Sequence, residues 1–150
     1  MSGLRPDAGE AVETARRSAE AMWEDDRASQ SLGMRIVAVG PGTATVQMTV
    51  RDDMVNGHGI GHGGFTFSLA DSAFAFACNS YNRRTVAQAC EIRYLAPTRL
   101  GDVLTAVAVE RTRVGRDGTY DVTVSSADGV VAEFVGTSKE IRGTFFDDTP

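Results

Sequence analysis

An aspartate inside an apolar stretch is the first residue of this 150-residue chain whose position suggests chemistry. Asp71 is the one charged residue of FTFSLADSAFAFAC, residues 65–78. Aspartate is a poor mid-helix residue, and burying a carboxylate without partners costs on the order of several kcal/mol. We therefore expect Asp71 to act as a general base or a nucleophile with a desolvated carboxylate. The structural alternative is that it hydrogen-bonds Ser68 or Ser72, or faces an interface partner.

A glycine-rich segment stands directly before this stretch. Residues 56–64 read NGHGIGHGG and contain both histidines of the chain, His58 and His62. Glycines let a substrate approach the backbone closely, and the first turn of a helix has N–H groups without intrahelical partners. With the helix dipole behind them, the N–H groups near Gly63 and Gly64 are suited to stabilise an oxyanion. The alternative is a turn that merely leads the chain into the helix.

Three other kinds of site fit this segment less well. Gly59, Gly61 and Gly64 match G-x-G-x-x-G, but a dinucleotide site needs a strand leading directly into the motif and a parallel βαβ unit after it. A Walker loop is excluded because the chain has no Gly-Lys-Ser/Thr there. A metal site is disfavoured because glycines separate His58 from His62 and no further close ligand accompanies them. We expect neither a metal nor a cofactor.

The hydrophobic pattern predicts the elements that position these groups. Residues 7–29 have apolar side chains at three- and four-residue spacing, which is typical of an amphipathic helix. Apolar residues occupy every face of the helix after the glycines, so we expect it to be enclosed. Alternation predicts six strands, at residues 34–40, 43–50, 88–95, 103–114, 119–127 and 130–143. The result is an α+β fold with a largely antiparallel sheet around one helix.

Composition and length limit the class of protein. A net charge of −5 argues against a general affinity for nucleic acid. No signal-peptide pattern and no apolar run of about 18 residues is present, so we expect a cytoplasmic protein without membrane contact. Cys78 and Cys90 lack CxxC spacing, which favours ordinary buried thiols. Residues 1–33 are expected to form an N-terminal helical segment, residues 34–143 one domain and residues 144–150 a frayed tail.

The segment VNGHGIGHGGFTFSLADSAFAFACNS, followed by QACEIRYLAPTRLGD, resembles the hotdog-fold acyl-CoA thioesterases of the phenylacetate-degradation (PaaI) type. The N-G-x-G-x-x-H-G-G turn, the aspartate and the Pro-x-x-x-Gly-Asp turn occur in that order, and the resemblance covers about residues 32–143. It implies a hotdog domain that hydrolyses acyl-CoA thioesters between two subunits. By this resemblance Gly63 offers its N–H to the thioester oxygen, Asp71 is the nucleophile or base, and Asn56 and His62 position the thioester and water. His58 receives no role.

Spacing along the helix has an independent consequence. Gly63 and Asp71 are eight residues apart, so about 12 Å separates them along one helix axis. They cannot flank one carbonyl carbon, so if both act on the same thioester, the carboxylate must come from a second copy across a two-fold axis. We therefore expect a homodimer as the catalytic unit. Pairing of two such dimers into a homotetramer is the expected assembled form, with the dimer itself as the open alternative.

Further positions are expected to contact the substrate, and two other functions stay open. The expected substrate-binding residues are Gly64, Phe65, Ser68, Ser72 and Arg93. Further candidates for binding the CoA phosphates are Arg83, Arg84, Arg99, Arg113 and Arg116. The residues that would line an aromatic acyl pocket, or else pack in the core, are Met54, Phe65, Phe67, Phe74 and Tyr81. The acyl group itself, phenylacetyl, hydroxyphenylacetyl or medium-chain, stays open. A non-catalytic acyl-CoA-binding protein is one alternative function. A hotdog lyase that hydrates enoyl thioesters is the other, although such lyases usually join a nearby histidine to the aspartate.

Overall fold

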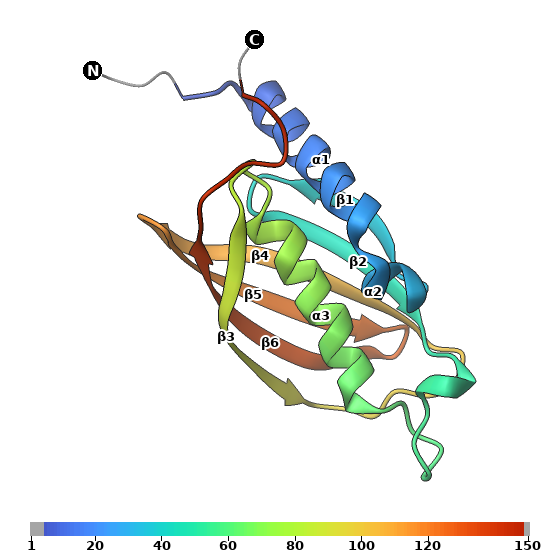
Figure 1. Cartoon of the computed structure of the whole chain (residues 1–150). Coiled ribbons are helices and arrows are strands. Elements are labelled where there is room, and N and C mark those ends of the chain that lie inside the picture. Colours follow the sequence, from blue (N-terminus) through green and yellow to red (C-terminus); the bar gives the residue numbers. More distant parts are fainter. Residues whose placement is uncertain (1–4, 149–150) are drawn as a thin grey trace.

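A six-stranded antiparallel sheet curves around one central helix in the computed structural model, which describes residues 5–148 (Figure 1). The strands are β1 (Arg35–Gly40), β2 (Thr43–Thr49), β3 (Thr85–Tyr94), β4 (Val103–Val114), β5 (Asp117–Ser126) and β6 (Gly129–Glu140). Their spatial order is β1-β2-β4-β5-β6-β3, and each neighbouring pair is antiparallel. The predicted hotdog arrangement with an N-terminal helix is confirmed.

The central helix α3 (Gly63–Cys78) lies across the concave face of the sheet (Figure 1). Ala106 and Ala108 on β4 are buried, and such small side chains let the helix approach the sheet closely. A Cβ at Gly136 would lie 2.8 Å from the ring of Phe74, so a larger residue there would push the helix away. The buried core between helix and sheet includes Val46, Met48, Leu69, Phe76, Leu104, Val122, Val124 and Phe134.

One side of α3 remains open in the single chain. Gly64 is exposed, while Ser68, Asp71 and Ala75, which follow at three- and four-residue spacing, are half-buried. The prediction that this helix is enclosed on every face is wrong for one chain, because the sheet curves around only part of its circumference. β3 is also an edge strand, and its second side pairs with no strand within residues 5–148.

The N-terminal helical segment is divided into two helices, α1 (Ala8–Asp25) and α2 (Arg27–Ser31). The predicted single helix is interrupted at Asp26, whose carboxylate accepts a hydrogen bond from the N–H of Ser29 at 3.0 Å and thereby starts α2. Trp23 packs on Phe76 with ring centroids 6.3 Å apart. A short 3-10 turn, η1 (Asp52–Met54), precedes the glycine-rich segment. No helix within residues 5–148 is long and apolar enough to span a bilayer.

The last described residues are held against the domain by hydrogen bonds to Asn82. The side-chain amide of the buried Asn82 donates to the carbonyl oxygen of Phe146 at 2.9 Å and to Asp148 at 2.7 Å. Its oxygen accepts from the N–H groups of Phe145 and Phe146. The expectation of a frayed tail is therefore not met for residues 144–148, and the last two residues lie outside the described part.

Candidate active site

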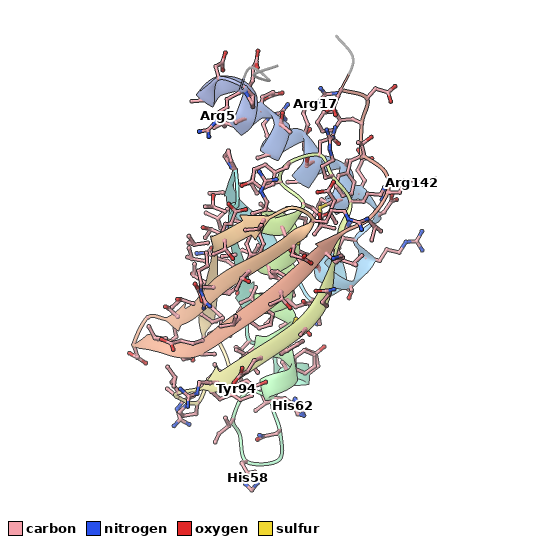
Figure 2. The ribbon with its side chains drawn as sticks, turned by 90° about the vertical axis from the view of Figure 1, so that its left-hand side faces the viewer. Arg5, Arg17, His58, His62, Tyr94 and Arg142 are labelled. Atoms are coloured by element: carbon pink, nitrogen blue, oxygen red, sulfur yellow. The ribbon has the colours of Figure 1, made fainter. Side chains whose placement is uncertain are left out.

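The glycine-rich segment forms a loop that ends at the N-cap of α3. Asn56 closes the loop, because its side-chain oxygen accepts from the N–H groups of His58 at 2.9 Å and Ile60 at 3.2 Å. Figure 2 shows His58 at the tip of this loop and His62 at its base, next to Tyr94. Asn56 thus shapes the loop through its side-chain oxygen. Its side-chain amino group has no hydrogen-bond partner within residues 5–148.

Close contacts explain two of the glycines. A Cβ at Gly61 would lie 1.9 Å from Oγ1 of Thr98, and the N–H of Gly61 donates to the carbonyl oxygen of Thr98 at 2.8 Å. A Cβ at Gly63 would lie 2.9 Å from Cζ of Tyr94. The bare backbone therefore lets the loop pack against residues 94–98, so part of the glycine content has a structural cause.

The two expected N–H donors at the start of α3 differ in the structure. His62 is the N-cap residue, and its Nδ1 accepts a hydrogen bond from the N–H of Gly64 at 3.0 Å. The N–H of Gly63 has no acceptor among the described residues. Contrary to expectation, the N–H of Gly64 is thus occupied by the cap, and of the two expected donors only that of Gly63 remains for an oxyanion within residues 5–148.

Asp71 lies two helical turns further along, half-buried on the open side of α3. Desolvation raises the pKa of its carboxyl above the ordinary value, and the negative charge of Asp26 adds to the effect. The one side-chain hydrogen bond to this carboxylate within residues 5–148 comes from the thiol of Cys90, with Sγ 4.0 Å from Oδ1. Desolvation and the charge of Asp71 raise the pKa of the Cys90 thiol in turn, so this neighbour stays neutral.

The two serines that could have satisfied Asp71 bind other groups. Ser68 Oγ donates to the carbonyl oxygen of Gly64 at 2.8 Å, and Ser72 Oγ hydrogen-bonds Ser29 Oγ at 2.8 Å. The structure therefore does not support the purely structural explanation of Asp71 through these side chains. A partly buried carboxylate with a raised pKa is the arrangement expected of a base or nucleophile.

A change at Asp26 is expected to alter the pH dependence of the reaction. Asn at position 26 retains an oxygen for the α2 cap but loses the charge that raises the pKa of Asp71. A base acts in its deprotonated form, so lowering its pKa moves the acid limb of the profile to lower pH. We expect Asp26→Asn to shift the acid limb of kcat/KM in that direction without changing the plateau. An unmoved or upward-shifted limb would contradict this electrostatic coupling.

The other expected site residues lie in three places: at the start of α3, in the core, or on the outer face of the sheet. Phe65 lies beside His62, with ring centroids 6.0 Å apart, so it belongs to the start of α3. Arg93 pairs in register with Glu133 and alternates with the inward Ile92, which places it on the outer face of the sheet, away from α3.

Several remaining candidates are occupied by other contacts. Met54 and Phe74 are buried in the core. Tyr81, beyond the C-terminus of α3, donates to Glu110 at 3.0 Å and lies under the guanidinium of Arg113. Two more arginines are engaged with the C-terminal segment: Arg83 pairs with Asp148 and Arg84 lies over Phe145.

Three contacts of the site were missed from the sequence. Tyr94 bonds the start of α3, Cys90 lies beside Asp71, and Asp26 raises the pKa of Asp71. Strand alternation places Cys90 and Tyr94 on one face of β3, but no sequence signal aligns that face with α3.

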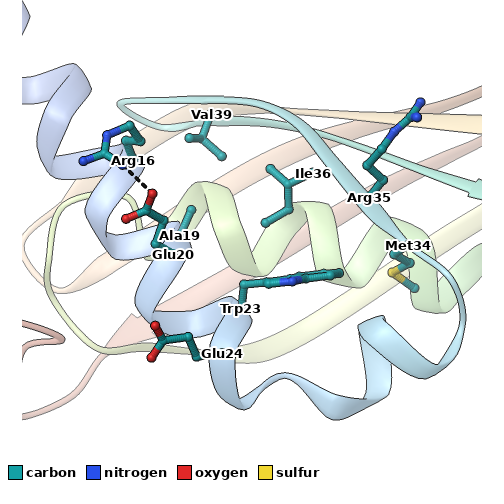
Figure 3. A pocket seen from close by; sticks show the side chains of 9 residues that line it. All are labelled: Arg16, Ala19, Glu20, Trp23, Glu24, Met34, Arg35, Ile36 and Val39. Carbon is teal, nitrogen blue, oxygen red and sulfur yellow. Dashed lines mark hydrogen bonds and ion pairs between the residues drawn. The ribbon is translucent and has the colours of Figure 1, made fainter.

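Two of the hollows in the described part of the chain bear on where a ligand has room. A groove of about 470 Å³ beside Gly63 is lined by Ile60, Gly61, Gly63, Thr66, Tyr94, Leu95, Ala96, Pro97, Thr98 and Val131. A second hollow, of about 510 Å³, lies between α1 and β1, where Trp23 and Met34 form apolar walls (Figure 3). None of the predicted site residues lines the second hollow. Within residues 5–148, no three His, Cys, Asp or Glu side chains group closely enough to hold a metal.

The fold defines a hotdog domain with the donor and carboxylate that a thioester hydrolase needs, and comparison with known proteins gives the family. The model of the thioesterase superfamily matches residues 58–133, from the glycine-rich loop into β6. Acyl-coenzyme A thioesterase PaaI of Escherichia coli is 46% identical over 129 residues, which cover 85% of this chain and 92% of that protein. The chain belongs to the thioesterase superfamily, and the predicted PaaI-type resemblance is confirmed.

Solved structures agree with this assignment. The E. coli PaaI protein from the phenylacetic acid degradation operon superposes with a TM-score of 0.88 at 44% identity, covering 89% of this chain and 98% of that one. A mutant of phenylacetic acid degradation protein PaaI from Thermus thermophilus gives 0.75 at 40% identity, covering 77% and 100%. A Streptococcus mutans protein bound to acetyl CoA gives 0.70 at 27% identity, covering 74% and 90%.

Proposed function

We propose that this chain hydrolyses acyl-CoA thioesters to the free acid and CoA, with phenylacetyl, hydroxyphenylacetyl or related aryl and medium-chain acyl groups as substrates. The PaaI relatives and the acetyl CoA seen in a similar structure support this substrate class. The observation that carries the proposal is on α3: the unoccupied N–H of Gly63 and the half-desolvated carboxylate of Asp71 occur on one helix whose open side a second copy can cover.

The geometry supports a site shared between two copies of the chain. Tyr94 on β3 contacts Gly63, and Cys90 on the same face of β3 contacts Asp71. Pairing β3 with β3 of a second copy, so that Cys90 opposes the partner's Tyr94, would bring Asp71 beside the partner's Gly63. The two-fold axis then passes next to Ile92, and both sites form at once.

Charges on the outer face of the sheet support the same register. With the axis at Ile92, Glu91 lies opposite the partner's Arg93, and the reverse pair forms on the other side of the axis. Both side chains are exposed in the single chain, and opposite charges across an antiparallel pair are favourable. Arg93 would thus serve the interface or a CoA phosphate at its margin. Further pairing of dimers into a tetramer, and a cytoplasmic location, complete the proposal.

The proposed reaction uses each group once. The carboxylate of Asp71 either takes a proton from the attacking water or itself attacks the thioester carbon, and the carbonyl oxygen, as it gains charge, accepts from the N–H of Gly63. The C–S bond then breaks, and the CoA thiolate leaves and is protonated. In the covalent route, water hydrolyses the intermediate anhydride and regenerates the carboxylate. Asn56 and His62 orient the thioester and the water, and Phe65 contacts the acyl group.

Release of free thiol from purified protein tests this function. Phenylacetyl-, hydroxyphenylacetyl-, medium-chain acyl- and enoyl-CoA are each supplied, and kcat/KM is compared across the panel. We expect thiol release with an aryl or medium-chain preference, and its loss in an identically purified Asp71→Asn protein. Loss of enoyl absorbance without thiol would instead identify a lyase, and CoA ester binding with neither signal would identify a non-catalytic binding protein.

A further inference from the structure

Tyr94, the last residue of β3, packs directly against the first residue of α3. Its hydroxyl donates to the carbonyl oxygen of Gly63 at 3.0 Å. Its ring also leaves no room for a side chain there, since a Cβ at Gly63 would lie 2.9 Å from Cζ. Tyr94 nevertheless remains 54% exposed, so burial accounts for little of its value to the fold. Its most specific contact in the single chain is the one with this peptide.

The hydrogen bond continues through the peptide into an imidazole. The carbonyl group of Gly63 and the N–H of Gly64 belong to one peptide unit, so a donor on the oxygen makes that N–H a stronger donor. The N–H of Gly64 in turn donates to Nδ1 of His62 at 3.0 Å. Because Nδ1 accepts, a neutral His62 carries its proton on Nε2. The edge-on contact with Phe65 also orients the imidazole ring.

We propose that Tyr94 is a positioning residue that, through the peptide between Gly63 and Gly64, fixes His62 as its Nε2–H tautomer beside the free N–H of Gly63. The inference rests on the proposed function and deepens it. His62 then serves the thioester as a hydrogen-bond donor and does not act as a base. The site gains a side-chain donor next to its backbone donor, and the tyrosine hydroxyl that aligns both never touches the reacting atoms.

The test replaces Tyr94 by Phe, which keeps the ring on Gly63 and removes only the hydroxyl. Tyr81→Phe is the matched control, because it removes a hydroxyl bonded to Glu110 beyond the opposite end of α3. The chain has two histidines, so ¹⁵N spectra of the imidazoles at about pH 8 contain two spin systems, and His58→Gln assigns them. Kinetics on the acyl-CoA panel are measured for the same proteins.

In the unchanged protein we expect His62 to show the pure Nε2–H pattern and the exposed His58 an average of both tautomers. In Tyr94→Phe, His62 should move toward the averaged pattern, and kcat should fall about 3- to 10-fold with little change in KM, the scale of one lost hydrogen bond. Tyr81→Phe should change neither quantity.

Each other outcome overturns a stated part of the inference. If His62 shows an average of both tautomers in the unchanged protein, the hydrogen bonds from Tyr94 through the peptide do not fix its tautomer. A tautomer that is insensitive to Tyr94→Phe removes the role of the tyrosine, even if kcat falls. A tautomer shift without loss of kcat removes the catalytic consequence. The spectra need no substrate. They therefore test whether Tyr94 fixes the His62 tautomer even if every CoA ester proves inert and the proposed function fails.

Discussion

Asp71→Asn is expected to lower kcat by about two orders of magnitude or more, the usual scale for loss of a catalytic base. The amide is nearly isosteric with the carboxylate but neither basic nor nucleophilic. Binding of CoA esters should persist, since the proposed mechanism places Asp71 at the reacting atoms and not at the nucleotide. The measurement is thiol release under saturating substrate, together with a direct binding assay. Asp26→Asn is the matched control, because it removes a neighbouring carboxylate and leaves Asp71 in place.

Thermal unfolding separates this result from a loss of structure. The pKa of Asp71 is raised in the folded chain, so the charged carboxylate destabilises the fold at neutral pH, and the penalty disappears as pH falls below the ordinary pKa of an aspartate. Asp71→Asn should therefore unfold at a slightly higher temperature than the parent at pH 7, and the difference should vanish in acid. Near-normal turnover, or an unfolding temperature lower at pH 7, would return Asp71 to a structural role.

Mixing two inactive variants is expected to restore activity if the site is shared. One variant is Asp71→Asn, and the other is Gly63→Pro, which lacks the N–H at a helix start where the φ of proline is tolerated. In a random mixture half of the dimers are mixed, and each mixed dimer has one intact site of two. About a quarter of the unmodified activity per chain should therefore return. Subunit exchange is verified with two differently tagged proteins.

The structure supplies a control for the proline. Any residue with a Cβ at position 63 displaces the ring of Tyr94, so Gly63→Pro also disturbs that contact. Gly63→Ala makes the same displacement and keeps the N–H. We expect the alanine variant to retain clearly more activity than the proline variant, which isolates the donor. If exchanged mixtures are as inactive as their folded, dimeric parents, each site lies within one chain and the shared arrangement is wrong.

Local sequence patterns were sufficient for the order of the central helix and the six strands, and for placing the two proposed catalytic residues on that helix. Strand alternation and the all-apolar helix predicted six strands around one helix, because each signal depends on residues within a few positions of one another. The same locality placed Gly63 and Asp71 on one helix with a spacing too long for a single carbonyl. The ordered glycine, aspartate and Pro-x-x-x-Gly-Asp motifs then indicated the thioesterase family.

The details of the donor groups were decided by tertiary structure. Both Gly63 and Gly64 occupy the first turn of α3, and only the rotamer of His62 determines that the N–H of Gly64 is occupied. The contact of Tyr94 with Gly63 joins residues 31 positions apart. No periodicity in either segment encodes that distance, because it depends on how β3 is aligned beside the helix.

The same alignment decided which expected residues lie near the site. A shift of β3 by one residue would exchange its two faces, turning Arg93 inward and Cys90 outward. The hydrophobic pattern of β3 is weak, with Gln88, Glu91 and Arg93 among its small and apolar residues, so the sequence leaves this choice open. Pairing with β6 settles the register, and the curvature of the sheet leaves one side of α3 uncovered. Both properties arise from contacts among distant segments, which only the folded chain brings together.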